Sequence, residues 1–342
     1  MLAAIVLASC VKSIPGPAHV SEDLMVFSAV ASHSVKNIIT TTNYPLDEPF
    51  VVDAVYYPDG NLSSEGETVM TREPVRYYFE DALWKSDNQH FWPQKGKLVF
   101  YAGSPVLPQV TLSTERGVEA DWSIPTESET DIDLCFARTV ENCESHSSMV
   151  PVVFNHALSQ VCFKARTIRD YSSKYHEGGY IQANVIRVYL DSVKIRGLVS
   201  EGHFTQRPRG WELNSSVTSD YTVFKREEGL ELKCDRYDNP ELNEIGTMLF
   251  IPQELPADAV IEEWHHADVR TSLTDTLSNV IVRDNSYTIR KSSVIPIREH
   301  CERWIMDFKY TLRLAVGIDD EESSLVVAIT DWTETKEIVL GD

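Results

Sequence analysis

Hydrophobic positions along this chain come in short runs separated by turn-forming residues. In the first half, runs rich in Val, Phe and Tyr cover residues 24–30, 50–57, 77–79, 98–102 and 150–154. The second half repeats this texture at residues 186–199, 221–224, 248–251, 279–283, 308–316 and 325–330. Such runs are typical of β-strands, and long stretches with the period of an amphipathic helix are nearly absent. The pattern therefore predicts an all-β protein built of antiparallel β-sandwiches.

The length of the chain predicts two domains. Its 342 residues, 42% of them hydrophobic, can fill two cores. The acidic, Ser-rich stretch at residues 141–148 is the best candidate linker. We therefore expect one sandwich over residues 24–148 and a second over residues 149–342, opened by the segment 150–165.

The first residues predict a membrane anchor. An apolar run over residues 1–7 ends in Leu7, Ala8 and Ser9 directly before Cys10, the pattern of a bacterial lipobox. Cys10 would be the acylated first residue of the mature chain, and residues 1–23 the signal and tether, since Pro and Gly follow the cysteine. The alternative is the start of a buried strand or helix, which the lack of a preceding basic region favours.

Charge excludes one class of partner. The chain has 31 Lys and Arg against 52 Asp and Glu, a formal net charge of −21. Because this charge repels phosphate backbones, nucleic acid is excluded as a natural partner. An acidic surface suits an exported protein, although the favoured interpretation is that charge of one sign only keeps the protein dispersed.

No motif for enzymatic chemistry stands out, and we expect no enzyme, cofactor or metal. The densest cluster of ligand-type residues surrounds Trp264: Glu262, Glu263, His265, His266 and Asp268. Adjacent histidines on a strand point to opposite faces, so an exposed polar loop is favoured over a metal site. His156, in an apolar run, is interpreted as a hydrogen-bonded structural residue.

The tryptophans and cysteines fit structural roles. Five of the seven tryptophans lie beside strand patterns, which favours packing in the core or at its rim over a sugar-stacking platform: Trp84, Trp92, Trp211, Trp304 and Trp332. Cys135 and Cys143 could close a short loop in an oxidising compartment. No cysteine spacing resembles a zinc site.

Several longer segments resemble one family, the fimbrillins that build type V pili in Gram-negative gut and oral bacteria. Residues 39–57 read ITTTNYPLDEPFVVDAVYY, and residues 91–105 read FWPQKGKLVFYAGSP. The most specific match is FNHALSQV at residues 154–161. Later matches are residues 188–204, MLFIPQEL at 248–255 and VVAITDW at 326–332.

The resemblance implies two transthyretin-like β-sandwich domains in a lipoprotein of the outer membrane surface. It also implies assembly by β-strand addition between pilus subunits: a protease removes the first strand, and a strand from the next subunit fills the groove. The candidate displaced strand contains Leu24, Val26, Ser28 and Val30. The candidate cleavage site is Lys36, which departs from the family's arginine. Either the processing enzyme differs, Arg72 or Arg76 is used instead, or this subunit is not processed.

The same resemblance makes the C-terminal segment a candidate donor strand, although an ordinary closing strand would look the same. Its apolar residues are Leu325, Val327, Ile329, Ile338 and Leu340. Such a tail favours a stalk or anchor subunit over a tip adhesin, with a host or bacterial surface receptor as a further possible partner. The alternative function is a non-polymerising surface lipoprotein that binds glycans through exposed tryptophans.

Overall fold

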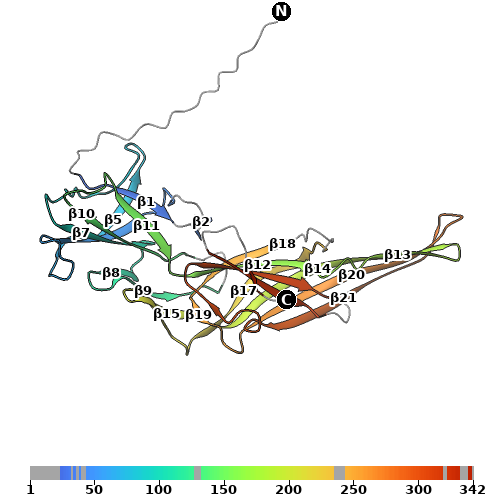
Figure 1. The fold of residues 1–342 in the computed structure, drawn as a ribbon. Coiled ribbons are helices and arrows are strands. Elements are labelled where there is room, and N and C mark those ends of the chain that lie inside the picture. The colour runs from blue at the N-terminus through green and yellow to red at the C-terminus, as the bar shows by residue number, and fades with distance from the viewer. Residues whose placement is uncertain are drawn as a thin grey trace, which may run out of the picture.

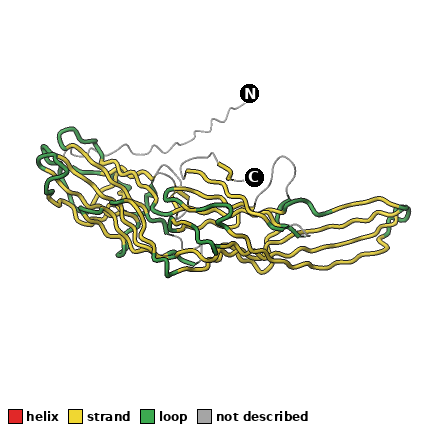
Figure 2. Tube along the Cα trace, turned by 60° about the horizontal axis from the view of Figure 1, so that its bottom comes forward, coloured by secondary structure: helices red, strands yellow, loops and turns green. Residues whose placement is uncertain are grey.

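The computed structural model describes residues 24–31, 34–35, 38–39, 44–126, 132–234, 243–318, 322–331 and 338–340. Every regular element in these ranges is a β-strand (Figures 1 and 2), so the all-β prediction is confirmed. Among the described residues there is no helix with the length and apolar character needed to cross a bilayer.

Seven strands of the first part close into a barrel in the order β1-β11-β10-β7-β4-β5-β6. Their bounds are β1 (Phe27–Ala31), β4 (Phe50–Tyr57), β5 (Glu67–Tyr78), β6 (Leu83–Ser86), β7 (Lys97–Ser104), β10 (Cys135–Asn142) and β11 (Val150–His156). The ring closes where β1 meets β6 through the pair Phe27 and Trp84. Closure removes the free edges that an open sandwich would leave.

Two further sheets share the larger core of the second part. One has the order β18-β12-β23-β24-β25, and the other has the order β13-β14-β20-β21 with β17 paired to β14. The first contains β12 (Ser159–Thr167), β18 (Asn243–Phe250), β23 (Phe308–Val316), β24 (Ser324–Asp331) and β25 (Ile338–Leu340). The second contains β13 (Ser173–Glu177), β14 (Tyr180–Val199), β17 (Thr218–Glu231), β20 (Val260–Asp275) and β21 (Ile281–Pro296). Its long strands extend away from the barrel (Figure 1).

A smaller sheet joins the two parts. Its order is β16-β15-β9-β8, with β8 (Val110–Ser113) and β9 (Gly117–Ser123) from the first half of the chain and β15 (Glu201–Gln206) and β16 (Arg209–Leu213) from the second. Two short pairs complete the described strands: β2 (Ser34–Val35) with β3 (Ile38–Ile39), and β19 (Gln253–Glu254) with β22 (Arg303–Trp304).

The expected boundary at residue 148 falls inside the barrel. Residues 143–149 connect β10 to β11, which are antiparallel neighbours in one sheet. A hairpin connection and a domain linker draw on the same turn-forming residues, so composition could not separate them. The segment 150–165 is divided accordingly, with β11 in the barrel and β12 in the second part. The division into two domains stays a prediction.

Candidate assembly site

The N-terminal strand β1 lies between two barrel strands that would otherwise be edges. It pairs in parallel with β11 from Phe27 opposite Val150 to Ala31 opposite Phe154, and it meets β6 at a single residue pair. The Val150 N–H donates to the Val26 carbonyl at 2.7 Å. Since the ladder to β6 is so short, β1 is held mainly on its β11 side.

Phe27 anchors β1 in the barrel core. Its side chain is 1% exposed, and its ring lies edge-on to Phe50 and Phe100, with centroids 6.3 and 5.9 Å away. Tyr44, Trp84 and Phe154 extend the aromatic cluster around Phe50. Removal of β1 would expose an apolar, aromatic groove between β11 and β6.

The core-facing side of β1 is the face that the sequence prediction did not name. Met25 and Phe27 are buried in the barrel core, and Ala29 packs against it. Of the predicted positions, Val26 is buried outside that cluster, and Ser28 and Val30 are half-buried. Apolar residues occupy both faces of this run, so its alternation did not reveal which face turns inward.

A polar contact supports the loop that holds the start of β1. The Met25 N–H donates to the His90 carbonyl at 2.8 Å, and His90 Nε2 lies 2.8 Å from Glu73 Oε2. Ser86 Oγ also donates to this carboxylate at 2.6 Å. Burial acts to raise the pKa of Glu73, but the hydrogen bonds from Ser86 and His90 outweigh it and leave the pKa below its ordinary value.

The candidate cleavage residues have different surroundings. Arg72 and Arg76 lie within β5, which is paired with both β4 and β6. The Arg72 guanidinium donates to the Leu107 carbonyl at 2.6 Å, and its backbone N–H donates to Asp53. Cleavage at either arginine would separate β4 as well as β1 from the chain. Lys36 and the lipidation candidate Cys10 lie outside the described residues.

The C-terminal segment is divided between a core strand and an edge strand. Leu325 and Val327 on β24 are buried in the core of the second part, and Ile329 packs against it. β24 itself lies between β23 and β25. Ile338 and Leu340 belong to β25, which pairs with β24 at the end of that sheet. A donor strand drawn from β24 would leave a gap in the chain's own core.

The cluster around Trp264 lies on a strand, which corrects the expected exposed loop. It belongs to β20, where Glu263 and His265 are buried and lie 2.8 Å apart. His266 faces the other way and contacts Asp191 at 2.6 Å. The two histidines therefore do point to opposite faces. Charged and polar residues occupy both faces of this part of β20, including the buried Glu263 and His265, so the alternation of apolar and polar residues that predicts a strand is missing here.

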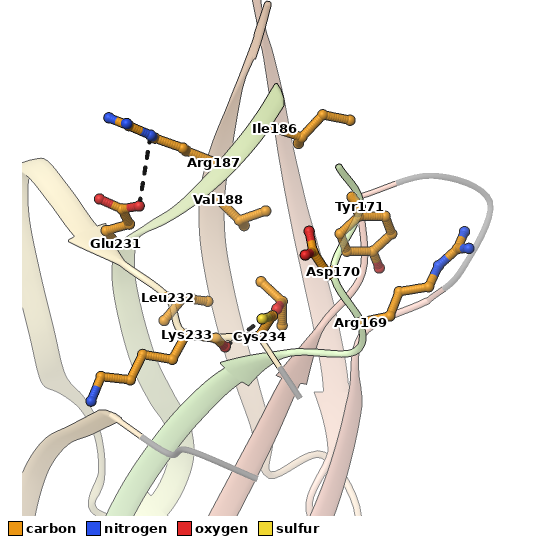
Figure 3. A pocket seen from close by; sticks show the side chains of 11 residues that line it. Arg169, Asp170, Tyr171, Ile186, Arg187, Val188, Glu231, Leu232, Lys233 and Cys234 are labelled. Atoms are coloured by element: carbon orange, nitrogen blue, oxygen red, sulfur yellow. Dashed lines mark hydrogen bonds and ion pairs between the residues drawn. The ribbon is translucent and has the colours of Figure 1, made fainter. Parts of the chain in front are cut away.

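The described tryptophans form no exposed row. Four are buried, namely Trp84, Trp92, Trp122 and Trp304, and Trp211 packs against the core of the second part. Trp264 on β20 is 36% exposed and is the one exposed tryptophan among the described residues. The cavity in Figure 3, about 580 Å³ in volume, has Tyr171 as its one aromatic lining residue. Its rim carries an ion pair between Arg187 and Glu231 at 3.9 Å. This surface is unlike a platform of stacked aromatic rings for sugars.

Cys135 and Cys143 are both free and buried. They lie at the start and just beyond the end of the extended strand β10. Eight residues of strand span about 26 Å, several times the Cα separation of a disulfide. The suggested short loop between them is therefore absent.

Comparison with known proteins shows which family this chain belongs to. A model described as fimbrillin-like matches residues 51–332. Sequence comparison finds no match among curated proteins. A proposed cell adhesion protein from Bacteroides uniformis is similar in structure, with a TM-score of 0.53 and 11% identity over 91% of this chain and 99% of that one.

Two further structures are more distant. A proposed cell adhesion protein from Bacteroides ovatus has a TM-score of 0.48 and 12% identity, covering 92% of this chain and 99% of its own. The fimbrial anchor protein Mfa2 from Porphyromonas gingivalis has a TM-score of 0.30 and 9% identity, covering 90% of this chain and 98% of its own. At these identities the first comparison supports the fold alone, and the other two add no argument.

Proposed function

Because the chain belongs to the fimbrillin-like family, we propose that it is a structural and adhesive subunit of a type V pilus that assembles by donor-strand exchange. The family places it among pilus-type subunits that associate with one another at the cell surface. The main support for donor-strand exchange is the position of β1. This one strand closes the barrel, and its Phe27 fills an aromatic groove. A strand from another subunit could satisfy the same backbone groups. In this family the role is structural and not enzymatic.

The accepting groove lies between β11 and β6. After cleavage on the C-terminal side of β1, the backbone of β11 would lose its parallel partner. Unpaired strand edges beside an apolar groove favour addition of a new strand. Lys36 is the cleavage residue that we favour over Arg72 and Arg76, because it follows β1 in the sequence and precedes β4. A cut there would separate β1 alone from the barrel strands.

The donor is the segment that follows β24. Leu325 and Val327 complete their own core, so removing them would cost the second part its stability. Among the described strands, β25 is the last of its sheet and pairs with β24 alone. Its departure would therefore expose one edge of β24 and leave β24 itself in the sheet. Ile338 and Leu340 are then the apolar residues available to a neighbour's groove, and such a tail favours a stalk or anchor role.

We also propose that the two parts are transthyretin-like domains and that the chain has a lipid anchor. Acylation of Cys10 would attach the subunit to the outer membrane before assembly. Replacing Cys10 with Ala should release the chain into the soluble fraction. A variant that carries no lipid and still sediments with membranes would contradict the anchor.

Strand exchange can be tested with a pair of complementary variants. One lacks residues 332–342, so after cleavage at Lys36 it has an open groove and no donor. The other carries Lys36→Gln, so it keeps its donor and its own β1. We expect cleaved full-length chain to form SDS-resistant ladders, each variant alone to stay monomeric, and the mixture to stop at dimers. Mass spectrometry should show that cleavage removes the residues up to Lys36.

Two results would overturn the mechanism. Cleaved full-length chain that stays monomeric at high concentration would exclude self-polymerisation. Ladders that form equally from Lys36→Gln would show that β1 need not leave. Four of the six described tryptophans are buried, and Trp264 is the one that is exposed, at 36%, which weighs against glycan binding through a row of aromatic rings as the main function.

A further inference from the structure

A polar cluster is buried at the junction of the barrel with the second part. Asp133 precedes β10, Cys135 begins it, and His156 ends β11. His156 Nδ1 lies 2.6 Å from Asp133 Oδ2 and 3.6 Å from Cys135 Sγ. One ligand atom from each of these three residues lies within 4.8 Å of the other two. The pairing of β10 with β11 brings these three residues together, although His156 is more than 20 residues away from the other two in the sequence.

The cluster is deeply buried and incompletely neutralised. His156 and Cys135 are 0% exposed and Asp133 is 6% exposed. Asp133 Oδ1 is buried and accepts no hydrogen bond within the described part of the chain. A buried carboxylate is costly unless it is paired or coordinates a metal. The Asp133 side chain therefore has an unused acceptor facing the protein interior.

A second carboxylate comes from the other part of the chain. The backbone N–H of His156 donates to Asp307 Oδ1 at 3.3 Å, and the backbone N–H of Asp307 donates to the Leu158 carbonyl at 3.1 Å. Asp307 adopts a left-handed φ of 69° in the connection between β22 and β23. Asp133 thus contacts the imidazole of His156 and Asp307 contacts its backbone, and a positive charge beside these two carboxylates would compensate both.

We propose that Asp133, Cys135 and His156 form a binding site for a divalent transition metal ion, with Zn²⁺ as the best match. The donor set of one sulfur, one nitrogen and one oxygen suits Zn²⁺ and excludes Ca²⁺ and Mg²⁺, which bind oxygen ligands. Asp307 adds negative charge from the second part. Because Asp307 is more than 150 residues away from His156 in sequence, the metal would stabilise the junction between the two parts.

Metal binding at this site should release a proton. Burial, with Asp133 close by, raises the pKa of the Cys135 thiol, so the metal-free thiol is neutral at physiological pH. A bound cation favours the thiolate, and the thiol proton leaves to solvent.

Nucleophilic catalysis is the other chemistry that a Cys, a His and an Asp can perform. A nucleophile must reach its substrate, and here the cysteine and the histidine are both completely buried. The neighbouring carboxylates also favour the protonated thiol, whereas a catalytic cysteine is usually activated as thiolate. Burial and charge both favour a structural metal site.

The test uses the full chain, stripped of metal with a chelator and then titrated with Co²⁺ under reducing conditions. We expect one equivalent of Co²⁺ to give thiolate-to-cobalt charge-transfer absorption, which surface carboxylates cannot produce. Zn²⁺ should abolish this absorption and raise the melting temperature. Cys135→Ser should lose the absorption, whereas Cys162→Ser, which removes another buried free thiol on β12, should keep it.

A third variant separates loss of a metal ligand from loss of the fold. Asp133→Asn is nearly isosteric and keeps the thiol, so it should fold, and because it alters a direct ligand it should lower the affinity for Zn²⁺ by at least the roughly 10-fold that loss of an outer-shell partner costs. The proposal is overturned if the unaltered chain gives no charge-transfer absorption and Zn²⁺ leaves its melting temperature unchanged. Equal loss of absorption in Cys162→Ser and Cys135→Ser would also overturn it, as would unchanged Zn²⁺ affinity in Asp133→Asn.

Discussion

Replacing Phe27 with Ala should loosen β1 in the barrel. The ring is buried and contacts Phe50 and Phe100 edge-on. Truncating a core Phe to Ala costs about 3–5 kcal/mol, because burial is lost and a cavity remains. The two aromatic contacts, each worth about 0.5–1.5 kcal/mol beyond area burial, place Phe27 within this range and not below it.

That loss should appear as local opening of β1. Since about 1.4 kcal/mol corresponds to a tenfold change in an equilibrium, the open population should rise by roughly two to three and a half orders of magnitude. This holds if β1 opens without the whole barrel, as a strand with a single residue pair to β6 can do. Val30→Ala is the matched control, because Val30 is half-buried on the other face of the same strand; its cost should be about 1 kcal/mol or less.

Hydrogen exchange followed by mass spectrometry measures this opening. Peptides covering residues 24–31 should lose protection in Phe27→Ala, while peptides from β7 and β12 keep theirs. Unchanged protection of β1 would refute the view that Phe27 anchors it. Equal loss in β7 and β12 would show that β1 unfolds only with the rest of the molecule, and the displaceable-strand argument would then fail.

Three further outcomes are expected. Glu73→Gln should destabilise the chain at neutral pH. Because the pKa of Glu73 is lowered in the folded chain, its carboxylate contributes its full stability above the ordinary pKa of 4.5. This stability is lost as the pH falls through the pKa of the folded chain. Urea unfolding should therefore show the variant approaching the unaltered chain below this pH. Leu325→Ala should lower the free energy of unfolding by about 2–5 kcal/mol. Val326→Ala, at a 36% exposed position, should lower it by less than about 0.5 kcal/mol. Equal losses in the two variants would place β24 outside the core. Alkylation without a reductant should modify both Cys135 and Cys143 in unfolded chain, and a disulfide between them would contradict the strand geometry.

Local sequence patterns determined most of the strands. The run at residues 50–57 coincides with β4, and the run at 308–316 with β23, because Val, Ile, Phe and Tyr favour extended backbone wherever they are clustered. The segments resembling fimbrillins likewise identified the family that the family model confirms. The pattern does not predict β20, because many positions on both of its faces are polar, including the buried Glu263 and His265.

Tertiary structure decided what the patterns left open. Whether the turn at residues 143–149 joins two domains or two strands depends on which strands pair, and pairing is a long-range property. The inward face of β1 depends on its register against β11, since a shift of one residue would exchange Phe27 for Ser28 in the core. The approach of Asp307 to His156 depends on the packing of the second part against the barrel. Sequence therefore determined where strands form and what family they belong to, while only the fold decided which side chains meet, because contacts between distant residues are set by packing and not by local propensity.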